Sequence, residues 1–247
     1  MEQQRKDAYD LNLFAKRARM RFNPKPLFPI AIMLKVYGRV SSINVQKVIW
    51  CLEELGKKEG IDYERIDAGL QFGVNNTDAY LKMNPNGLVP TLVDGDFVLW
   101  ESNTIVRYLA AAYGVGNLLP ANYKTRADTE RWMDWSLATL WPTLRVSYLG
   151  LTRTAPDQQN IPAIKKHYQD TTKLMQILDG VLADKLYCTG AEFTLGDIIL
   201  AVAVDRWVTL PAQFPEVLGA LPSLPSLMAW HRRVTSRQGF LKLHQTA

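Results

Sequence analysis

Residues 83–103 combine side chains and backbone features that could bind a small peptide. Pro90 has no N–H to give to a sheet, so it must lie at a sheet edge or in a turn, which leaves the backbone of Val89 free to pair with an extended chain. Glu101 and Ser102 come just before a helical pattern, and the free N–H groups of a helix start suit a carboxylate. Together these features would accept a short extended peptide with a carboxylate at one end.

The same stretch can also be explained by structure alone. Asn84–Gly87 is a dense turn signal, and the two apolar runs within 91–100 flank an Asp-Gly turn, which predicts a β-hairpin. Ser102 or Asn103 would then cap the next helix, and Pro90 would be an ordinary edge residue. Spacing alone leaves both interpretations open.

Two further hydroxyls, Ser41 and Ser42, lie between an expected strand at 33–37 and a helix whose apolar stripe begins at Val45. Serine at such a place is an ordinary helix cap. It could instead donate a hydrogen bond to a bound thiolate, and that donor, beside helix N–H groups, would lower the pKa of the thiol. A serine acting as acyl nucleophile would need a histidine base, and the sequence shows no such pairing.

Metal and cysteine chemistry find little support. None of the three histidines forms an HExxH pair, and Cys51 and Cys188 lie far apart without metal-type spacing. There is no phosphate-binding glycine loop and no GxSxG motif. We therefore expect no metal, and the unpaired cysteines make a reducing, cytoplasmic location the default expectation.

Charge and hydropathy exclude further classes of partner. The net charge is +5, but residues 1–32 carry seven basic and three acidic side chains, so the remainder is nearly neutral. We expect no nucleic-acid partner, because that would need clustered cations with interleaved aromatics on the folded body. No apolar run approaches the roughly 18 residues that span a bilayer, so no membrane association is expected. For residues 1–32, an upstream start, a weak targeting segment and a surface arm remain open, and we favour a mobile extension.

The order of elements predicts an α/β domain followed by an all-α domain. A strand, a helix, a second strand at 61–67, an irregular segment at 68–77, the hairpin and a helix give the thioredoxin-like order βαβ-α-ββα. Glycine, asparagine and proline then mark a linker, and strand signals stop. The expected parts are the extension 1–32, a thioredoxin-like domain 33–114, a linker 115–122 and a helical domain 123–247. Within that last domain we expect helices at 127–149, 161–186, 198–208 and 221–233, with Thr194 and Asp197 as a capping box.

Two motifs resemble the glutathione transferase superfamily. MNPNGLVPTLVDGDFVLWESNTIVRYLA is similar to its glutathione-binding segment. The resemblance implies a cis peptide bond at Pro90, backbone pairing of Val89 with the cysteinyl part of glutathione, and a γ-glutamyl end held by Glu101 and Ser102. The region 68–77 would help to hold the glycine end, with Gln71 or Asn76 as the expected contact.

YGRVSSINVQKV resembles the first strand–helix unit of serine-type members, notably phi- and theta-like bacterial ones. The resemblance implies that Ser42, four residues after the glycine, is catalytic, with Ser41 as runner-up and Asn44 as a further contact. The loop lacks the cysteine of cysteine-type members. Tyr37 lies within the strand, so the tyrosine-type mechanism is not supported either.

The implied activity is the conjugation of glutathione, as co-substrate, to a small apolar electrophile in detoxification. Haloacids, activated aromatics and organic peroxides are all candidate substrates, and a homodimer is expected. Trp141, Arg145 and Tyr148 on the first long helix would form the wall for this second substrate, although aromatics at helical spacing fit a core equally well. A glutathione-dependent peroxidase or reductase, or a non-enzymatic scaffold with the same fold, remain alternatives.

Overall fold

The computed structural model describes residues 33–245 except 115 and 117. The expected extension, residues 1–32, lies outside the described residues, as does part of the expected linker. The division at 115–122 therefore stays a prediction.

A four-stranded sheet in the order β2-β1-β3-β4 forms the first half of the described chain. The first two strands are parallel and joined by a helix, whereas the other pairs are antiparallel, with Tyr37 opposite Thr91. Gly95 supplies the positive φ of +62° that the tight turn between the last two strands requires. The sheet confirms the predicted parallel pair and hairpin. The strands are β1 (Leu34–Tyr37), β2 (Tyr63–Ile66), β3 (Thr91–Asp94) and β4 (Phe97–Trp100).

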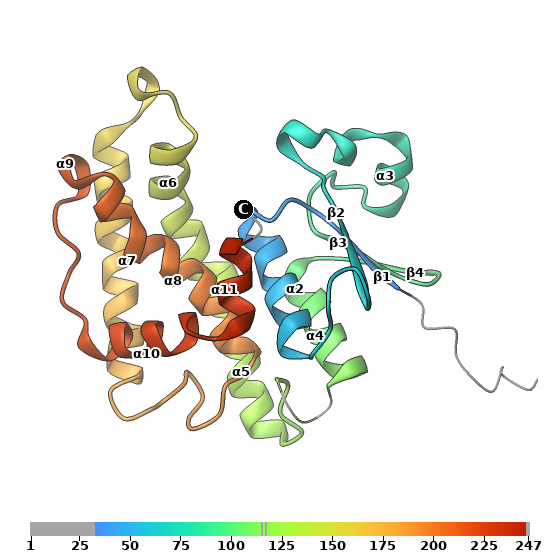
Figure 1. The fold of residues 1–247 in the computed structure, drawn as a ribbon. Coiled ribbons are helices and arrows are strands. Elements are labelled where there is room, and N and C mark those ends of the chain that lie inside the picture. Colours follow the sequence, from blue (N-terminus) through green and yellow to red (C-terminus); the bar gives the residue numbers. More distant parts are fainter. Residues whose placement is uncertain (1–32, 115, 117, 246–247) are drawn as a thin grey trace, which may run out of the picture. The chain divides into compact units, whose positions relative to one another are not determined.

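Three helices and two short 3₁₀ segments accompany the sheet. α2 forms because its apolar residues recur at helical spacing, and Val45, Val48 and Leu52 are fully buried. α2 packs against α4 and α8, and Figure 1 shows α2 and α4 between the sheet and the helices of the second half. The elements are α2 (Ile43–Glu54), 3₁₀ segments at Leu70–Phe72 and Val74–Asn76, α3 (Asp78–Met83) and α4 (Ser102–Tyr113).

The helices and turns of the second half form no strand in the described ranges, which confirms the predicted class: a thioredoxin-like domain followed by an all-helical one. The single helix expected at 127–149 is instead two α-helices joined by a π-helical segment. A last helix, not expected from the sequence, packs against α2. The elements are α5 (Tyr123–Trp135), the π segment Ser136–Leu140, α6 (Trp141–Thr152), a 3₁₀ turn at Pro156–Gln158, α7 (Ile161–Val181), α8 (Leu195–Gln213), α9 (Pro215–Leu218), α10 (Pro225–Thr235) and α11 (Gln238–Gln245).

The helix expected at 198–208 continues beyond its predicted end, and Pro211 lies inside the last turn of α8. A proline removes the N–H that would bond the carbonyl four residues earlier. That carbonyl, on Trp207, accepts a hydrogen bond from the Tyr168 hydroxyl of α7 at 3.3 Å. The neighbouring helix therefore supplies the missing donor, and sequence alone could not show this.

The predicted capping box at the start of α8 is present. Asp197 is fully buried and accepts hydrogen bonds from the Thr194 and Cys188 N–H groups and from the Trp230 indole. Burial raises the pKa of this carboxyl, while these donors oppose the rise. The box anchors the helix that carries Arg206.

None of the helices in the described ranges combines the length and hydropathy that a bilayer span requires.

Candidate functional site

Two adjoining pockets gather the residues predicted to bind or catalyse, except those suggested for the glycine end of glutathione. The first, here the amide pocket, has a volume of about 50 Å³. The second, here the arginine pocket, has a volume of about 300 Å³. Asn44, Leu88 and Val89 line both. The amide pocket is completed by Asn84, Asn86, Pro90, Trp100, Glu101 and Ser102, and the arginine pocket by Arg39, Ser41, Ser42, Ile43, Trp141, Arg145, Tyr148, Leu149, Arg153 and Arg206.

One further hollow and two suggested binding residues of the described chain lie outside these two pockets. A larger hollow of about 520 Å³, lined by residues within 182–186 and 225–233, contains none of the predicted site residues. Gln71 and Asn76, suggested for the glycine end of glutathione, line neither of the two site pockets.

The turn at Asn84–Gly87 is fixed by a buried polar network. The Asn84 amide donates to the Leu88 carbonyl at 2.9 Å and to the Thr91 hydroxyl at 3.1 Å. The Tyr80 hydroxyl donates to the same Leu88 carbonyl at 2.6 Å. Because Tyr80, Asn84 and Thr91 are buried, the network holds the segment before β3 in one conformation. Sequence reasoning identified the turn but not the contribution of Tyr80.

The backbone at Val89 is presented to the pockets. The Val89–Pro90 peptide bond is cis, as the resemblance implied. Within the described residues, neither the N–H nor the C=O of Val89 forms a hydrogen bond. The residue lines both pockets, so an extended ligand backbone can pair with it.

Glu101 has a backbone conformation that is rare outside glycine. Its φ is +72°, and it occupies the N-cap of α4 without making a side-chain capping bond. The predicted caps, Ser102 and Asn103, lie instead in the first turn of the helix. A strained residue at a helix start marks a functional candidate, and the uncapped N–H groups there suit a carboxylate.

Ser42 is the N-cap of α2, and its hydroxyl makes no capping hydrogen bond with the described residues. It is 7 % exposed and faces the arginine pocket beside the first turn of the helix. Ser41 lines the same pocket but is exposed, and its carbonyl accepts a bond from Arg206 at 3.4 Å. Ser42 therefore has the free donor together with the helix N-terminus, which a thiolate would need.

Lys47 is a buried cation behind the amide pocket. Its ammonium donates to the side-chain oxygens of Asn44 at 3.0 Å and Asn103 at 3.3 Å, and it lines neither pocket. Burial, then the neighbouring charge of Arg206, lowers the Lys47 pKa to about 8, although Glu101 opposes the change. Lys47 thus joins α2 to α4 through Asn103, while its other partner, Asn44, lines both pockets.

The arginine pocket has a cationic lining that sequence reasoning largely missed. Arg145 was predicted, whereas Arg39, Arg153 and Arg206 were not. Arg153 lies eight residues after Arg145, which places both near one face of α6 and its end, so helical spacing could have identified it. Nothing in the sequence links Arg39 and Arg206 to this pocket, because Arg39 precedes α2 and Arg206 lies on α8.

The predicted aromatic residues lie on the wall of the same pocket. Trp141 and Tyr148 are partly buried, and their ring centroids are 6.0 Å apart. The Arg206 guanidinium lies over the Tyr148 ring at 5.1 Å, a cation–π distance. The wall is therefore aromatic on one side and cationic on the other.

Neither cysteine is placed for thiol chemistry at the site. Cys51 and Cys188 are both fully buried and line neither pocket. Burial raises the pKa of each thiol, so neither is a ready thiolate. Among the described residues, no group of three or more His, Cys, Asp or Glu side chains is placed to hold a metal ion.

Comparisons with known proteins agree with one another. Family models described as glutathione S-transferase, N-terminal domain and C-terminal domain match residues 33–111 and 162–233. Glutathione S-transferase GstB of Escherichia coli (strain K12) is 38% identical over 213 residues, covering 85% of this chain and 97% of that protein. Glutathione S-transferase 3 of Zea mays is 32% identical over 216 residues, covering 85% and 92%.

A solved structure shares the fold. The theta class glutathione S-transferase of Xanthomonas axonopodis pv. citri, with glutathione bound, superimposes with a TM-score of 0.75 at 39% identity. The alignment covers 87% of this chain and 98% of that one.

Proposed function

Because the chain belongs to the glutathione S-transferase family, we propose that it conjugates the thiol of glutathione to a small electrophile, with Ser42 stabilising the thiolate. The observation that carries this proposal is the free, nearly buried Ser42 hydroxyl at the N-terminus of α2. It faces a pocket that shares Asn44 and Val89 with the amide pocket. A peptide thiol bound along Val89 can therefore reach it.

Glutathione is proposed to bind along the amide pocket. The unpaired backbone of Val89 would pair with its cysteinyl residue, and Pro90, which has no N–H, separates that segment from β3. The γ-glutamyl carboxylate would accept hydrogen bonds from the Ser102 hydroxyl and from N–H groups at the start of α4. Asn44 would contact the ligand near its sulfur, because it lies on the shared wall.

Ser42 is proposed to act as a hydrogen-bond donor rather than as a nucleophile. A donor held near a developing thiolate lowers the thiol pKa, and the N-terminal dipole of α2 acts in the same direction. The thiolate, not the thiol, is the nucleophile. No base is required for this role, and no histidine lines either pocket among the described residues.

The second substrate is proposed to occupy the arginine pocket. Trp141 and Tyr148 would contact its apolar part, and Arg145 lies on the same helix. The volume of about 300 Å³ suits a small molecule. A cytoplasmic homodimer acting in detoxification completes the proposal; light scattering on the purified chain tests the dimer, which a monomeric mass would contradict.

Two measurements test the proposed function. Calorimetric titration should show that the protein binds glutathione, and a spectrophotometric assay should show that it accelerates the loss of glutathione thiol with a small halide. Binding without conjugation, together with peroxide reduction, would favour the peroxidase alternative. Absence of binding at millimolar glutathione would favour a non-enzymatic scaffold.

A further inference from the structure

We propose that the arginine pocket binds an anionic group of the electrophile, so that the preferred substrate is a small electrophile bearing a carboxylate or a comparable anion. This inference rests on the proposed function, because the pocket is assigned to the second substrate there. It differs from the apolar electrophile that family resemblance had suggested.

The first support is the absence of counter-charge. Four guanidinium groups line the pocket, and no aspartate or glutamate lines it among the described residues. No ion pair in the described part of the chain involves any of the four, whereas Arg65, Arg107 and Arg237 all have carboxylate partners. Cations gathered without counter-charge favour an anion.

The second support is the burial of two of these arginines. Arg39 is 9 % exposed and Arg206 is 8 % exposed, and the Nε atom of each is buried without a hydrogen-bond partner in the described residues. A buried donor that has no acceptor is costly. A bound carboxylate would supply the missing acceptor, because two oxygens match the planar donor pattern of a guanidinium.

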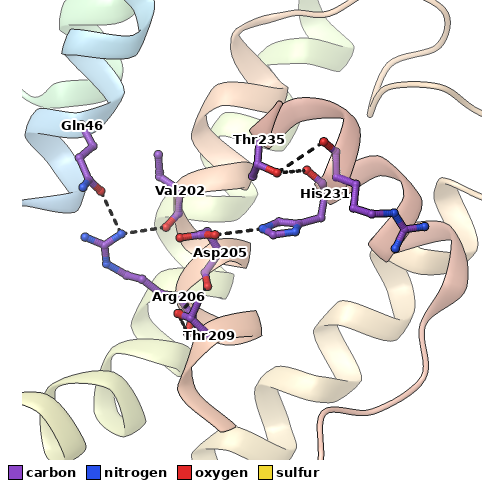
Figure 2. A network of polar contacts seen from close by, with 8 residues as sticks. Gln46, Val202, Asp205, Arg206, Thr209, His231 and Thr235 are labelled. Atoms are coloured by element: carbon purple, nitrogen blue, oxygen red, sulfur yellow. Dashed lines mark hydrogen bonds and ion pairs between the residues drawn. The ribbon is translucent and has the colours of Figure 1, made fainter. Parts of the chain in front are cut away.

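The third support is that the chain holds these side chains in place. Arg206 donates to the Gln46 side chain at 3.0 Å and to the Val202 carbonyl at 3.1 Å, so it reaches from α8 across to α2 (Figure 2). Arg39 lies under Gly69, where an added Cβ would come within 2.6 Å of its Nη1. Arg206 is therefore held by hydrogen bonds, whereas Arg39 is buried close to the backbone of Gly69.

Repulsion between the guanidinium groups adds to the cost of gathering them in one pocket. Burial and then the charge of Arg153 lower the pKa of Arg39. Burial also lowers the pKa of Arg206; Tyr148 and Asp205 oppose this change, and Arg153 adds a smaller lowering contribution. An anion between these groups would be attracted to all of them at once and would offset their repulsion. The Tyr148 ring packs against the Arg206 guanidinium.

The arrangement also limits the size of the substrate. Ser42 lines the same cavity of about 300 Å³ as the arginines, so the anion and the reacting carbon must both fit within it. A haloacid meets this demand. With iodoacetate, the glutathione thiolate attacks the methylene carbon, a C–S bond forms, the C–I bond breaks and iodide leaves with the electron pair. The thiol proton passes to solvent, and the product is S-carboxymethylglutathione.

A matched pair of ligands tests the anion site without requiring turnover. S-carboxymethylglutathione and S-carbamoylmethylglutathione differ only in a carboxylate against a neutral amide of similar shape. Calorimetric titration of the wild-type protein should give a dissociation constant at least about tenfold lower for the carboxymethyl compound, as expected for a charge-assisted contact. The ratio should shrink as salt is raised.

Arg145 is the most informative position to change, because it is exposed and has no ion pair among the described residues. Arg145→Gln should reduce the preference for the carboxymethyl compound several-fold, and Arg145→Lys should restore part of it. Arg232→Gln removes the same charge from an exposed site on α10 and should leave the preference unchanged.

The outcomes separate this inference from the proposed function. Equal affinity for the two compounds would overturn the anion site, whatever the turnover. An equal loss of affinity for both compounds and for glutathione in Arg145→Gln would also overturn it, because the arginine would then hold glutathione itself. A carboxymethyl preference that Arg145→Gln abolishes, with no conjugation of iodoacetate or iodoacetamide, would uphold the anion site and refute the proposed activity.

Discussion

The amide pocket takes all its lining except Asn44 from one stretch of chain, 84–102, whereas the arginine pocket collects side chains from the loop before α2, from α6 and from α8. The first offers amides, a hydroxyl and backbone groups. The second offers guanidiniums and aromatic rings. The two share one wall, with Ser42 beside it on the arginine side. We infer that glutathione binds on the amide side of this wall and the electrophile on the arginine side.

The buried cations near the two pockets differ in how their hydrogen-bond donors are satisfied. Lys47, behind the amide pocket, is buried but donates to two amide oxygens. Arg39 and Arg206 leave a buried nitrogen without a partner among the described residues. A buried charge with satisfied donors serves the fold, whereas one that has an unsatisfied donor and no carboxylate partner is available to a ligand. This contrast separates a structural cation from binding ones.

The largest effect is expected at the shared wall. Ser42→Ala should lower kcat/KM for conjugation about a hundredfold, as expected when one preorganised donor to a developing charge is lost. The dissociation constant of glutathione should change little, because the alanine removes no contact in the amide pocket. Ser41→Ala is the matched control and should retain most activity. Unchanged turnover of the Ser42 variant at neutral pH would refute its assignment.

An effect of similar size is expected from Lys47, and it appears as a dependence of stability on pH. The folded-state pKa of about 8 lies below the ordinary value of 10.5. Below pH 8 both states hold the proton; between about 8 and 10.5 the unfolded state binds more protons, so the free energy of unfolding rises with pH. The rise attributable to Lys47 would be about 3 kcal/mol in total.

Urea unfolding at several pH values, compared between wild type and Lys47→Met, measures this rise. The variant should lack it, so the difference between the two proteins should change steadily from about pH 8 to about pH 10. Parallel curves would show that burial does not destabilise the Lys47 ammonium, and the lowered pKa would be refuted.

The smallest effect is expected on the amide side. Ser102→Ala should weaken glutathione binding about tenfold, which corresponds to the loss of one hydrogen bond to a charged group. Conjugation at saturating glutathione should be nearly unaffected. Ser223→Ala, at an exposed position outside both pockets, serves as the control. An unaltered dissociation constant would remove Ser102 from the glutathione site.

The contrast between a pocket built from one stretch of chain and a pocket built from distant elements explains what the sequence could predict. The amide pocket was predictable because its residues follow one another, so that turn, edge and helix-start signals lie side by side. The arginine pocket depends on packing between α2, α6 and α8, and the sequence carries no signal for that packing. Arg206 illustrates the limit: 160 residues separate it from Gln46, its side-chain partner.

The fold shows a similar division. Apolar spacing and turn signals predicted the strands, α2 and the capping box of α8 correctly. They failed at Pro211, where Tyr168 on another helix replaces the lost donor. They also missed α11, whose Gly239 packs so closely that an added Cβ would lie 2.4 Å from the Trp50 ring. Each failure involves a contact between segments far apart in the chain.

The proposal on which the others depend is that Ser42 stabilises a thiolate at the wall between the two pockets. Ultraviolet absorbance of the protein–glutathione complex, titrated against pH for wild type and Ser42→Ala, tests it without any electrophile. We predict that the bound thiol of the wild type ionises below its free value and that the variant loses this shift. Identical titrations of the two proteins, both with glutathione bound, would show that the Ser42 hydroxyl does not stabilise the thiolate.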